Sequence, residues 1–271
     1  MAIVIGIDVG SSASKGILLR DGEVLGSINL PSGGDFKGTS QEIRKVLCEQ
    51  AGIWIGDIAR VVATGFGAKR VDFADEIKLD LLCHAKAVSL LLPSVRTVID
   101  VGDLSTKVIQ IDGQGGLHNF LLSGKCAGGS GRILQVIAKV LRVKIEEVGE
   151  LSLRSKGRVE FQTGCAVFAE SEVISRISEG VAKEDLLAGV HWALAGQVNS
   201  LVERIGIEMD IGMVGGGARD IGLVRAFQNI RGHEVRVPPS PHMTGALGAA
   251  LLAMEGLSET TEPGKGMGDR R

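Results

Sequence analysis

Short runs of apolar residues separated by polar turns open the chain, and this spacing is typical of β-strands. Such runs cover Ala2–Asp8, Gly16–Leu19 and Glu23–Ile28, and a later run covers Ile58–Ala63. Asp21-Gly22 separates two of them and favours a tight hairpin turn. The opening segment therefore predicts three consecutive strands that include a β-hairpin.

Helical spacing of apolar residues appears further along. Residues 39–42 (Thr-Ser-Gln-Glu) have the composition of a capping box and predict a helix start. Apolar positions recur at helical spacing over Ile133–Leu141, directly after a glycine-rich loop. A helix of small residues is predicted at 242–252, after the prolines of Pro238–Pro241. From Ser258 onward the chain is polar, and we expect it to fray.

The opening strand and its turn recur once. Ile7–Lys15 (IDVGSSASK) aligns without a gap on Ile99–Lys107 (IDVGDLSTK), and an Asp-Gly turn follows each copy, at Asp21 and Asp112. Each copy reads as a strand, a tight polar turn, a second strand and a hairpin. The sequence therefore predicts a chain of two related halves.

Composition and charge limit the kinds of protein and partner that can be expected. The chain has 271 residues, of which 44% are hydrophobic and 23% charged, as expected for one large or two medium globular domains. Its 30 Lys and Arg against 32 Asp and Glu leave a net charge of -2 without a basic stripe, so nucleic acid is not expected as a partner. No apolar run has the length of a membrane span and no leader is recognisable, so we expect a cytoplasmic protein without a membrane partner.

The repeated turns have a chemical use. Two such hairpins could aim backbone N–H groups, hydroxyls and a lysine each at one polyphosphate, while Asp8 and Asp100 hold a hydrated magnesium ion. There is no GxxxxGK[ST] motif, so a P-loop enzyme is excluded. A third glycine run, Gly215–Ala218, follows an apolar strand and would let a base and ribose lie against the backbone. The candidate nucleotide-binding residues are Gly10, Ser11, Ser12, Ala13, Ser14, Lys15, Gly102, Ser105, Thr106, Lys107, Gly128, Gly129, Gly215, Gly216, Gly217 and Ala218.

The four cysteines lie far apart without a CxxC pair, so neither a zinc ribbon nor a disulfide scaffold is indicated. Cys126 lies in the glycine-rich loop of residues 124–132, and Cys165 opens a second helical run in residues 162–172. The positive end of a helix dipole stabilises a thiolate and any anionic group that it ligates. Two such cysteines point to a shared partner, and the alternative is a pair of buried core cysteines.

The order of these motifs resembles the superfamily of actin, sugar kinases and heat-shock chaperones. Within it, KCAGGSGR and CAVFAESEVIS, around Cys126 and Cys165, resemble the signatures of the activator ATPases of 2-hydroxyacyl-CoA dehydratases and the related ATPase subunits of benzoyl-CoA reductases, the BadF/BadG/BcrA/BcrD type. The resemblance runs from Ile3 to about Met254. We therefore expect an ATP-dependent activator.

The resemblance implies an α/β fold of two ribonuclease-H-like domains with a nucleotide cleft between them. The domains are expected at 1–96 and 97–241, the second carrying the cluster cysteines and the dimer interface. A helix at about 242–256 would pack back on the first domain, and 257–271 would form a polar tail.

The resemblance also implies the cofactors and partners. A homodimer would hold one 4Fe-4S cluster through Cys126 and Cys165 of each chain, and helix N-termini with Lys125 and Arg132 nearby would stabilise its negative charge. ATP or ADP with Mg would occupy the cleft. A ferredoxin or flavodoxin would supply the electron, and an iron-sulfur dehydratase or reductase would receive it as client.

One departure bears on turnover. The family commonly has DIGGQDSK at the second phosphate hairpin, whereas this chain has DVGDLSTK, which places Leu104 and Ser105 where Gln and Asp are usual. Because a Gln there could orient the attacking water, its replacement puts the rate of hydrolysis in question, while phosphate binding is preserved.

Other polar and sulfur groups are interpreted as structural. Adjacent helical residues point about 100° apart and rarely bind one ion, so Cys83 is expected in the core and His84 in a structural hydrogen bond. Cys48 lies in an amphipathic helix and is expected to be inert. Glu170 and Glu172 are expected in the first turn of a helix, in a solvated capping role.

The sequence leaves three alternatives open. The client could be a benzoyl-CoA reductase or another iron-sulfur protein of low potential. A small-molecule kinase of the same fold would need a catalytic aspartate such as Asp100 but no cysteines, and the low aromatic content of 3% counts against a sugar pocket. A nucleotide-sensing module that has lost hydrolysis is favoured by Leu104.

Overall fold

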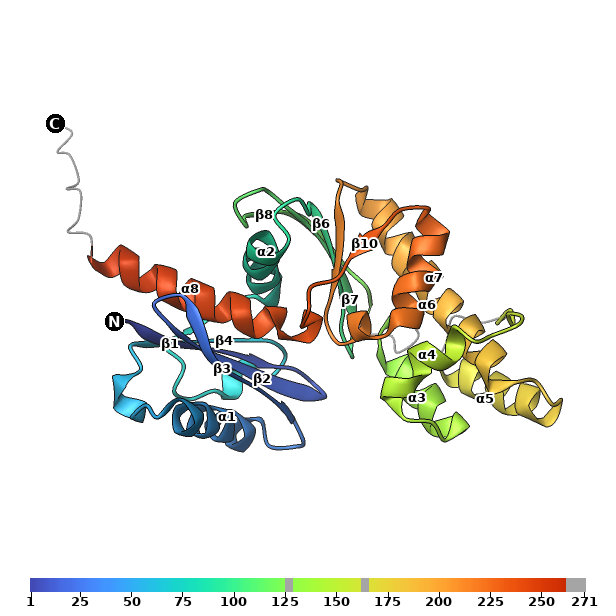
Figure 1. Cartoon of the computed structure of the whole chain (residues 1–271), viewed down its shortest axis with the longest axis horizontal. Coiled ribbons are helices and arrows are strands. Elements are labelled where there is room, and N and C mark those ends of the chain that lie inside the picture. The colour runs from blue at the N-terminus through green and yellow to red at the C-terminus, as the bar shows by residue number, and fades with distance from the viewer. Residues whose placement is uncertain (125–128, 162–165, 262–271) are drawn as a thin grey trace. The chain divides into compact units, whose positions relative to one another are not determined.

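The computed structural model describes residues 1–124, 129–161 and 166–261 (Figure 1). The chain divides into two compact units. Unit 1 consists of Met1–Cys83 and Gly245–Arg271, and unit 2 consists of His84–Thr244. None of the helices in the described part of the chain has the length and hydrophobicity that crossing a membrane requires.

Unit 1 is built on a five-stranded sheet with the order β3-β2-β1-β4-β5. Its strands are β1 (Ile3–Val9), β2 (Ala13–Arg20), β3 (Glu23–Pro31), β4 (Arg60–Thr64) and β5 (Glu76–Ile77). The first three are antiparallel neighbours, and β1 pairs with β4 in parallel. Asp21 and Gly22 have φ values of 50° and 90°, as a two-residue hairpin turn requires, so the predicted hairpin is confirmed.

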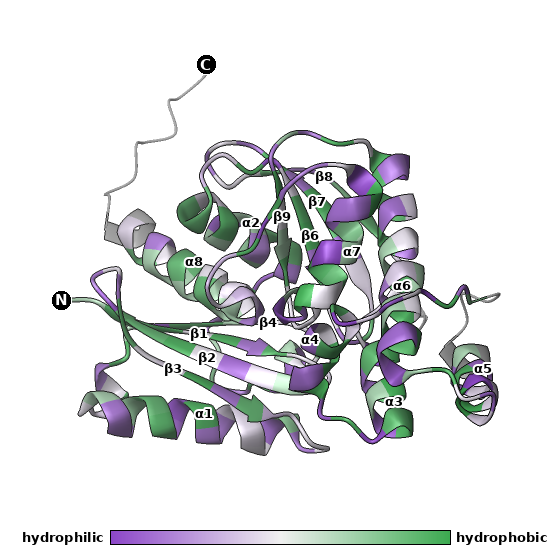
Figure 2. Cartoon of the chain, turned by 45° about the vertical axis from the view of Figure 1, so that its right-hand side comes forward, coloured by the Kyte–Doolittle hydropathy of each residue, from purple (hydrophilic) through white to green (hydrophobic). Residues whose placement is uncertain are grey.

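Two helices cover opposite faces of this sheet (Figure 1): α1 (Phe36–Ala51) and α8 (Thr244–Thr261). A Cβ on Gly16 would lie 2.3 Å from a methyl carbon of Ile43 in α1, so this glycine admits α1 to one face. A Cβ on Gly6 would lie 2.2 Å from the Ala246 carbonyl oxygen in α8, so the other face is equally close to its helix. Figure 2 colours α1 in alternating hydrophilic and hydrophobic bands, as an amphipathic helix requires.

The predicted start of α1 is wrong by about one turn. Asp35 is the N-cap, and its side-chain oxygen accepts a hydrogen bond from the Gly38 N–H at 2.9 Å. Ser40 is buried inside the helix and donates to the Lys37 carbonyl instead of capping. Aspartate competes well for the N-cap because its carboxylate accepts from the free N–H groups of the first turn.

Unit 2 repeats the sheet of unit 1 with the order β10-β9-β6-β7-β8. Its strands are β6 (Thr97–Val101), β7 (Thr106–Ile111), β8 (Leu117–Leu122), β9 (Ile211–Val214) and β10 (Val235–Arg236). The three antiparallel strands β6, β7 and β8 and the parallel pair of β6 with β9 match β1, β2, β3 and β4 one for one. The predicted two-half α/β fold is confirmed.

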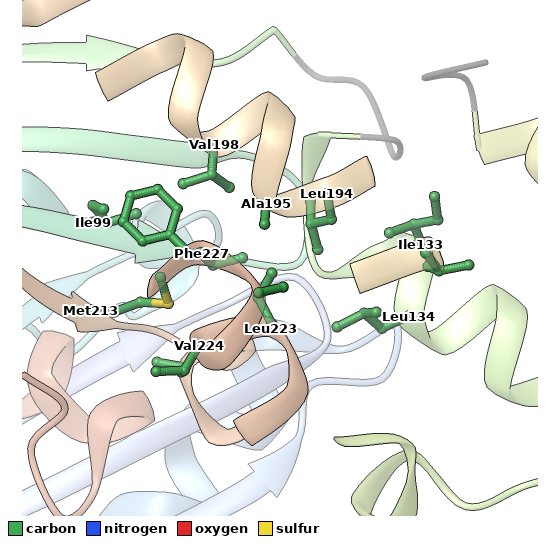
Figure 3. Close-up of a cluster of buried hydrophobic side chains, with 14 of the residues drawn as sticks. Ile99, Ile133, Leu134, Leu194, Ala195, Val198, Met213, Leu223, Val224 and Phe227 are labelled. Atoms are coloured by element: carbon green, nitrogen blue, oxygen red, sulfur yellow. The ribbon is translucent and has the colours of Figure 1, made fainter. Parts of the chain in front are cut away.

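Besides α1 and α8, the described residues form the helices α2 (Asp80–Leu91), α3 (Arg132–Leu141), α4 (Val148–Ser152), α5 (Ala166–Ser178), α6 (Lys183–Ile205) and α7 (Ile221–Arg231). The core of unit 2 lies where α6 and α7 pack together near the sheet. In Figure 3, Phe227 of α7 lies close to Ile99 of β6, Met213 of β9 and Val198 of α6. All four side chains are at most 1% exposed, so the sheet that carries the second hairpin is firmly supported.

Candidate functional site

The first hairpin joins β1 to β2 and places a carboxylate beside a lysine. Strand register pairs Asp8 with Lys15, and Lys15 Nζ lies 3.2 Å from Asp8 Oδ2. Ser14 is fully buried, and its hydroxyl hydrogen-bonds that of Ser32 at 2.8 Å. Ser32 in turn donates to the carbonyl of Gly10 at 2.6 Å. Ser14 therefore supports the turn from inside the fold, while Asp8 and Lys15 remain partly exposed.

The second hairpin has the same pair in the same register. Asp100 pairs with Lys107 across β6 and β7, and Lys107 Nζ lies 2.5 Å from Asp100 Oδ2. The Asp100 side chain is 4% exposed, against 13% for Asp8. In both halves the lysine is held beside the carboxylate at the point where the strand enters its turn. The two copies thus present a matched Asp–Lys pair, which suits phosphate and hydrated magnesium.

The turn of the second hairpin is bonded to the start of α3. The Gly131 N–H donates to the Gly102 carbonyl at 2.8 Å, and the Thr106 hydroxyl donates to the Gly129 carbonyl at 2.8 Å. The side chain of Asp103 accepts from Arg132 Nη2 at 2.6 Å and from Gln135 Nε2 at 2.9 Å.

These bonds bring Gly102, Thr106 and Gly129 together within unit 2. Thr106 and Ser130 are fully buried, and the Ser130 hydroxyl donates to the Asp103 carbonyl at 2.8 Å. Ser105 stays at the turn, where its carbonyl accepts from the Gly102 N–H at 3.1 Å. Backbone and side-chain hydrogen bonds therefore tie this turn to the first turn of α3.

The third glycine run also packs against the second carboxylate. Gly215 has φ +84°, and a Cβ there would lie 2.2 Å from Asp100 Oδ1 and 2.7 Å from the Val101 carbonyl oxygen. Only glycine combines this conformation with so close an approach. Gly217 and Ala218 are buried at the start of a 3₁₀ turn, whereas Gly216 faces open space. Open space beside Gly216 leaves room for a flat group against the backbone.

Unit 1 has a counterpart of this run that the sequence interpretation missed. Gly65 has φ +89°, and a Cβ there would lie 2.3 Å from Asp8 Oδ1, as for Gly215 and Asp100. A 3₁₀ turn, Ala68–Arg70, follows it just as Gly217–Arg219 follows Gly215. The pattern Gly-x-Gly-Ala-basic after a parallel strand occurs at both places and was the available signal.

His84 and Cys83 have different surroundings although they are adjacent. Cys83 is fully buried, and burial raises the pKa of its thiol to about 12. His84 Nδ1 hydrogen-bonds the Thr244 hydroxyl at 2.9 Å, and its Nε2 lies 3.5 Å from Asp100 Oδ2. The expectations of a core cysteine and a hydrogen-bonded histidine are confirmed, and the contact with Asp100 was not foreseen. Cys48 lies in helix α1 as expected; it is also buried, and burial raises the pKa of its thiol.

Cys126 and Cys165 lie outside the described residues, as do Lys125 and Gly128. The helices that follow the two cysteine motifs are described: α5 begins at Ala166, directly after Cys165, and α3 packs against α5. Among the residues that the structure describes, no group of three or more His, Cys, Asp or Glu side chains could by itself hold a metal ion.

The expected placement of Glu170 and Glu172 is wrong. Because α5 begins at Ala166, both lie beyond its first turn. Glu172 instead approaches Arg176 one turn later, at 3.9 Å. This pair follows the i,i+4 spacing of helical ion pairs.

The comparisons with known proteins agree over nearly the whole chain. Residues 5–253 match the model of the BadF/BadG/BcrA/BcrD ATPase family. The chain is 44% identical to the 2-hydroxyisocaproyl-CoA dehydratase activator of Clostridioides difficile, over 94% of this chain and 96% of that protein. It is 42% identical to the (R)-2-hydroxyglutaryl-CoA dehydratase activating ATPase of Acidaminococcus fermentans, over 92% and 96%.

A solved structure is similar over the same extent. The activator of the 2-hydroxyisocaproyl-CoA dehydratase from Clostridium difficile with bound ADPNP has a TM-score of 0.92 to this chain. It is 41% identical, and the match covers 98% of this chain and 100% of that one.

Proposed function

The chain belongs to the BadF/BadG/BcrA/BcrD ATPase family, and from this premise we propose that it is an ATP-dependent activator of a 2-hydroxyacyl-CoA dehydratase. The observation that carries the proposal is the near full-length similarity to two activators of such dehydratases. The family predicted from the two cysteine motifs is thereby confirmed.

The duplicated hairpins support the nucleotide part of the proposal. Lys15 and Lys107, each held beside a carboxylate, supply positive charge for the phosphates. Asp8 and Asp100 are the candidates to hold Mg through water, as well as the catalytic carboxylates. The backbone of Gly215–Ala218 is the candidate surface for base and ribose, since Gly216 faces open space. Chain groups thus supply both the charge and the flat surface that ATP needs.

The second part of the proposal is a 4Fe-4S cluster that the cysteines would ligate. Two thiolates per chain supply half of the four ligands that such a cluster takes, so a homodimer would complete the set through Cys126 and Cys165 of each subunit. The donor chemistry fits, and the helices that follow the two motifs pack against each other. When bound, the cluster would supply one-electron transfer from a ferredoxin or flavodoxin donor to an iron-sulfur client.

Hydrogen bonds within unit 2 offer a route for coupling. The turn that carries Gly102 and Asp103 holds the first turn of α3 through Gly131 and Arg132. Movement of this turn on exchange of ATP for ADP would pull on α3, which follows the Cys126 loop. In this way nucleotide turnover changes the surroundings of the cysteines.

Leu104 bears on the alternative of a nucleotide sensor. It takes the place of the glutamine that is usual in the family, which puts the rate of hydrolysis in question. A sensor would bind ATP without driving any electron transfer, whereas an activator would hydrolyse it as the client becomes reduced.

The test is reconstitution under anaerobic conditions. The purified chain is mixed with reduced ferredoxin, Mg-ATP and a purified 2-hydroxyacyl-CoA dehydratase, and dehydration of the 2-hydroxyacyl-CoA is followed. The proposal expects dehydration with ATP and little with a non-hydrolysable analogue. Equal dehydration with the analogue, or none at all with an otherwise active dehydratase, would contradict it. Lys107→Met is the matched variant, since it removes the charge beside Asp100 and should abolish the ATP effect.

A further inference from the structure

The two copies of the hairpin differ in what packs against their carboxylates. Beside Asp8 lies Gly245, where a Cβ would be 3.0 Å from Asp8 Oδ2. Beside Asp100 lies His84, with Nε2 at 3.5 Å from Oδ2, and both side chains are almost completely buried. The presence of a histidine beside Asp100 therefore distinguishes the second hairpin from the first.

The hydrogen bonds fix the ring of His84. The Thr244 hydroxyl donates to the Pro241 carbonyl at 3.0 Å. A hydroxyl has a single proton, so Thr244 Oγ1 accepts from His84 Nδ1 at 2.9 Å, and Nδ1 carries a proton. This leaves Nε2 facing the Asp100 carboxylate. Thr244 thus holds the ring through Nδ1, and the opposite edge of the ring lies against Asp100.

The same hydrogen bonds reach the third glycine run. The Pro241 carbonyl also accepts from the Gly215 N–H at 2.9 Å, and Gly215 packs on Asp100. Asp100, His84, Thr244, Pro241 and Gly215 therefore form a closed ring of contacts within unit 2. His84 and Thr244 are also the two residues at which the chain enters and leaves this unit.

We propose that His84 is a positioning residue that fixes Asp100 for nucleotide turnover and joins it, through Thr244, to the glycine run at Gly215. The inference rests on the proposed function, because it takes Asp100 as a nucleotide-site carboxylate. His84 itself need not touch the nucleotide. Removing its contact with Asp100 should slow turnover more than it weakens ATP binding.

A purely structural histidine would behave differently, and unit 2 contains one for comparison. His191 is 1% exposed, and its Nε2 lies 3.0 Å from Asp220 Oδ1. Asp220 caps α7 through the Leu223 N–H, so this pair supports a helix and not a phosphate hairpin. His191→Asn should lower the melting temperature and leave the kinetics of ATP hydrolysis unchanged.

The experiment compares His84→Asn, His84→Gln and Thr244→Val with wild type and His191→Asn in the full chain. Asn can keep the hydrogen bond to Thr244 but does not reach Asp100, whereas Gln extends as far as Nε2 does. The measurements are kcat and KM for ATP, and the rise in melting temperature that Mg-ADP produces. We expect His84→Asn to lower kcat by about 10- to 100-fold with a smaller change in KM, and His84→Gln to recover part of it.

The outcomes separate the two levels of the account. Unchanged kcat in both His84 variants and in Thr244→Val, with wild-type hydrolysis intact, would overturn the role of His84 alone. A fall in melting temperature like that of His191→Asn, without a specific loss of kcat, would also overturn it. Absence of both hydrolysis and the Mg-ADP response in wild type would overturn the nucleotide site and, with it, this inference. If the Asn variant does not fold, His84→Gln and Thr244→Val decide the question.

Discussion

Asp103 should couple nucleotide turnover to the cysteine-bearing part of unit 2. Its carboxylate accepts from Arg132 at 2.6 Å and from Gln135 at 2.9 Å, and both donors lie on α3. Asp103→Ala removes both bonds but keeps the backbone bond from Gly131 to Gly102. The variant should therefore loosen α3 from the turn of the second hairpin while leaving Asp100 and Lys107 in place.

The size of the effect follows from the exposure of the partners. A hydrogen bond to a charged group contributes about 1.5–3 kcal/mol when buried, and an exposed ion pair about 0.2–1 kcal/mol. The Arg132 side chain is 40% exposed and that of Asp103 is 12% exposed, so the ion pair falls between these limits. With the Gln135 bond added, the loss is about 1.5–2 kcal/mol, or about a 10- to 30-fold weaker coupling.

The assay measures ATP hydrolysis and client activation side by side. Asp103→Ala should keep ATP hydrolysis within a few-fold of wild type and consume about 10 to 30 times more ATP per dehydratase activated. Asp112→Ala is the matched control, because Asp112 accepts from the Gln114 and Gly116 N–H groups in the exposed turn between β7 and β8. An unchanged ratio of ATP hydrolysed to dehydratase activated in Asp103→Ala would show that Asp103 does not couple turnover to α3.

Three further outcomes are expected. Gly215→Ala should lose about 2–5 kcal/mol of stability from positive φ and overlap with Asp100, measured by calorimetry, while Gly216→Ala, which meets open space, should match wild type. Because burial raises the pKa of Cys83 from 9.0 to about 12, the contribution of the protonated Cys83 thiol to the free energy of unfolding is complete below pH 9. This contribution falls by up to about 1.4 kcal/mol per pH unit between pH 9 and about 12, and Cys83→Ala should show a shallower decline in alkaline denaturation. Gly196→Ala, within α6 and facing open space, should raise stability by about 0.5–1 kcal/mol, and a loss would show hidden strain there.

The duplicated fold could be predicted because a short sequence repeat marks the start of each half. The strand residues and the Asp and Lys at matched positions determine strand register, so aligning Ile7–Lys15 with Ile99–Lys107 was sufficient to place Asp8 and Asp100 equivalently. Sheet order then follows from the hairpins and the parallel pairings. Local sequence pattern alone is therefore sufficient to predict the strands and their hairpins.

Contacts between distant segments could not be predicted in the same way. His84 and Thr244 are 160 residues apart, and no spacing in the sequence indicates that they meet beside Asp100. The glycine run at Gly65 was overlooked because Phe66 interrupts it, although the same strand and 3₁₀ turn flank it. Asp35 displaced the predicted cap at residues 39–42 because its side chain reaches the first N–H groups of a helix that starts earlier. Only the contact between His84 and Thr244 depends on tertiary packing, whereas the Gly65 run and the Asp35 cap are local features.

The most direct test of the account is the iron content of the chain. Iron and acid-labile sulfide are measured per chain in anaerobically purified wild type, Cys126→Ala and Cys48→Ala, with visible spectra before and after dithionite. Cys48 is the control because it is a buried core thiol in α1. We expect about four iron and four sulfide per two chains in wild type and Cys48→Ala, with a visible spectrum that dithionite bleaches, and loss of both iron and sulfide in Cys126→Ala. Iron-free wild type that still binds Mg-ADP, or full iron in Cys126→Ala, would contradict it.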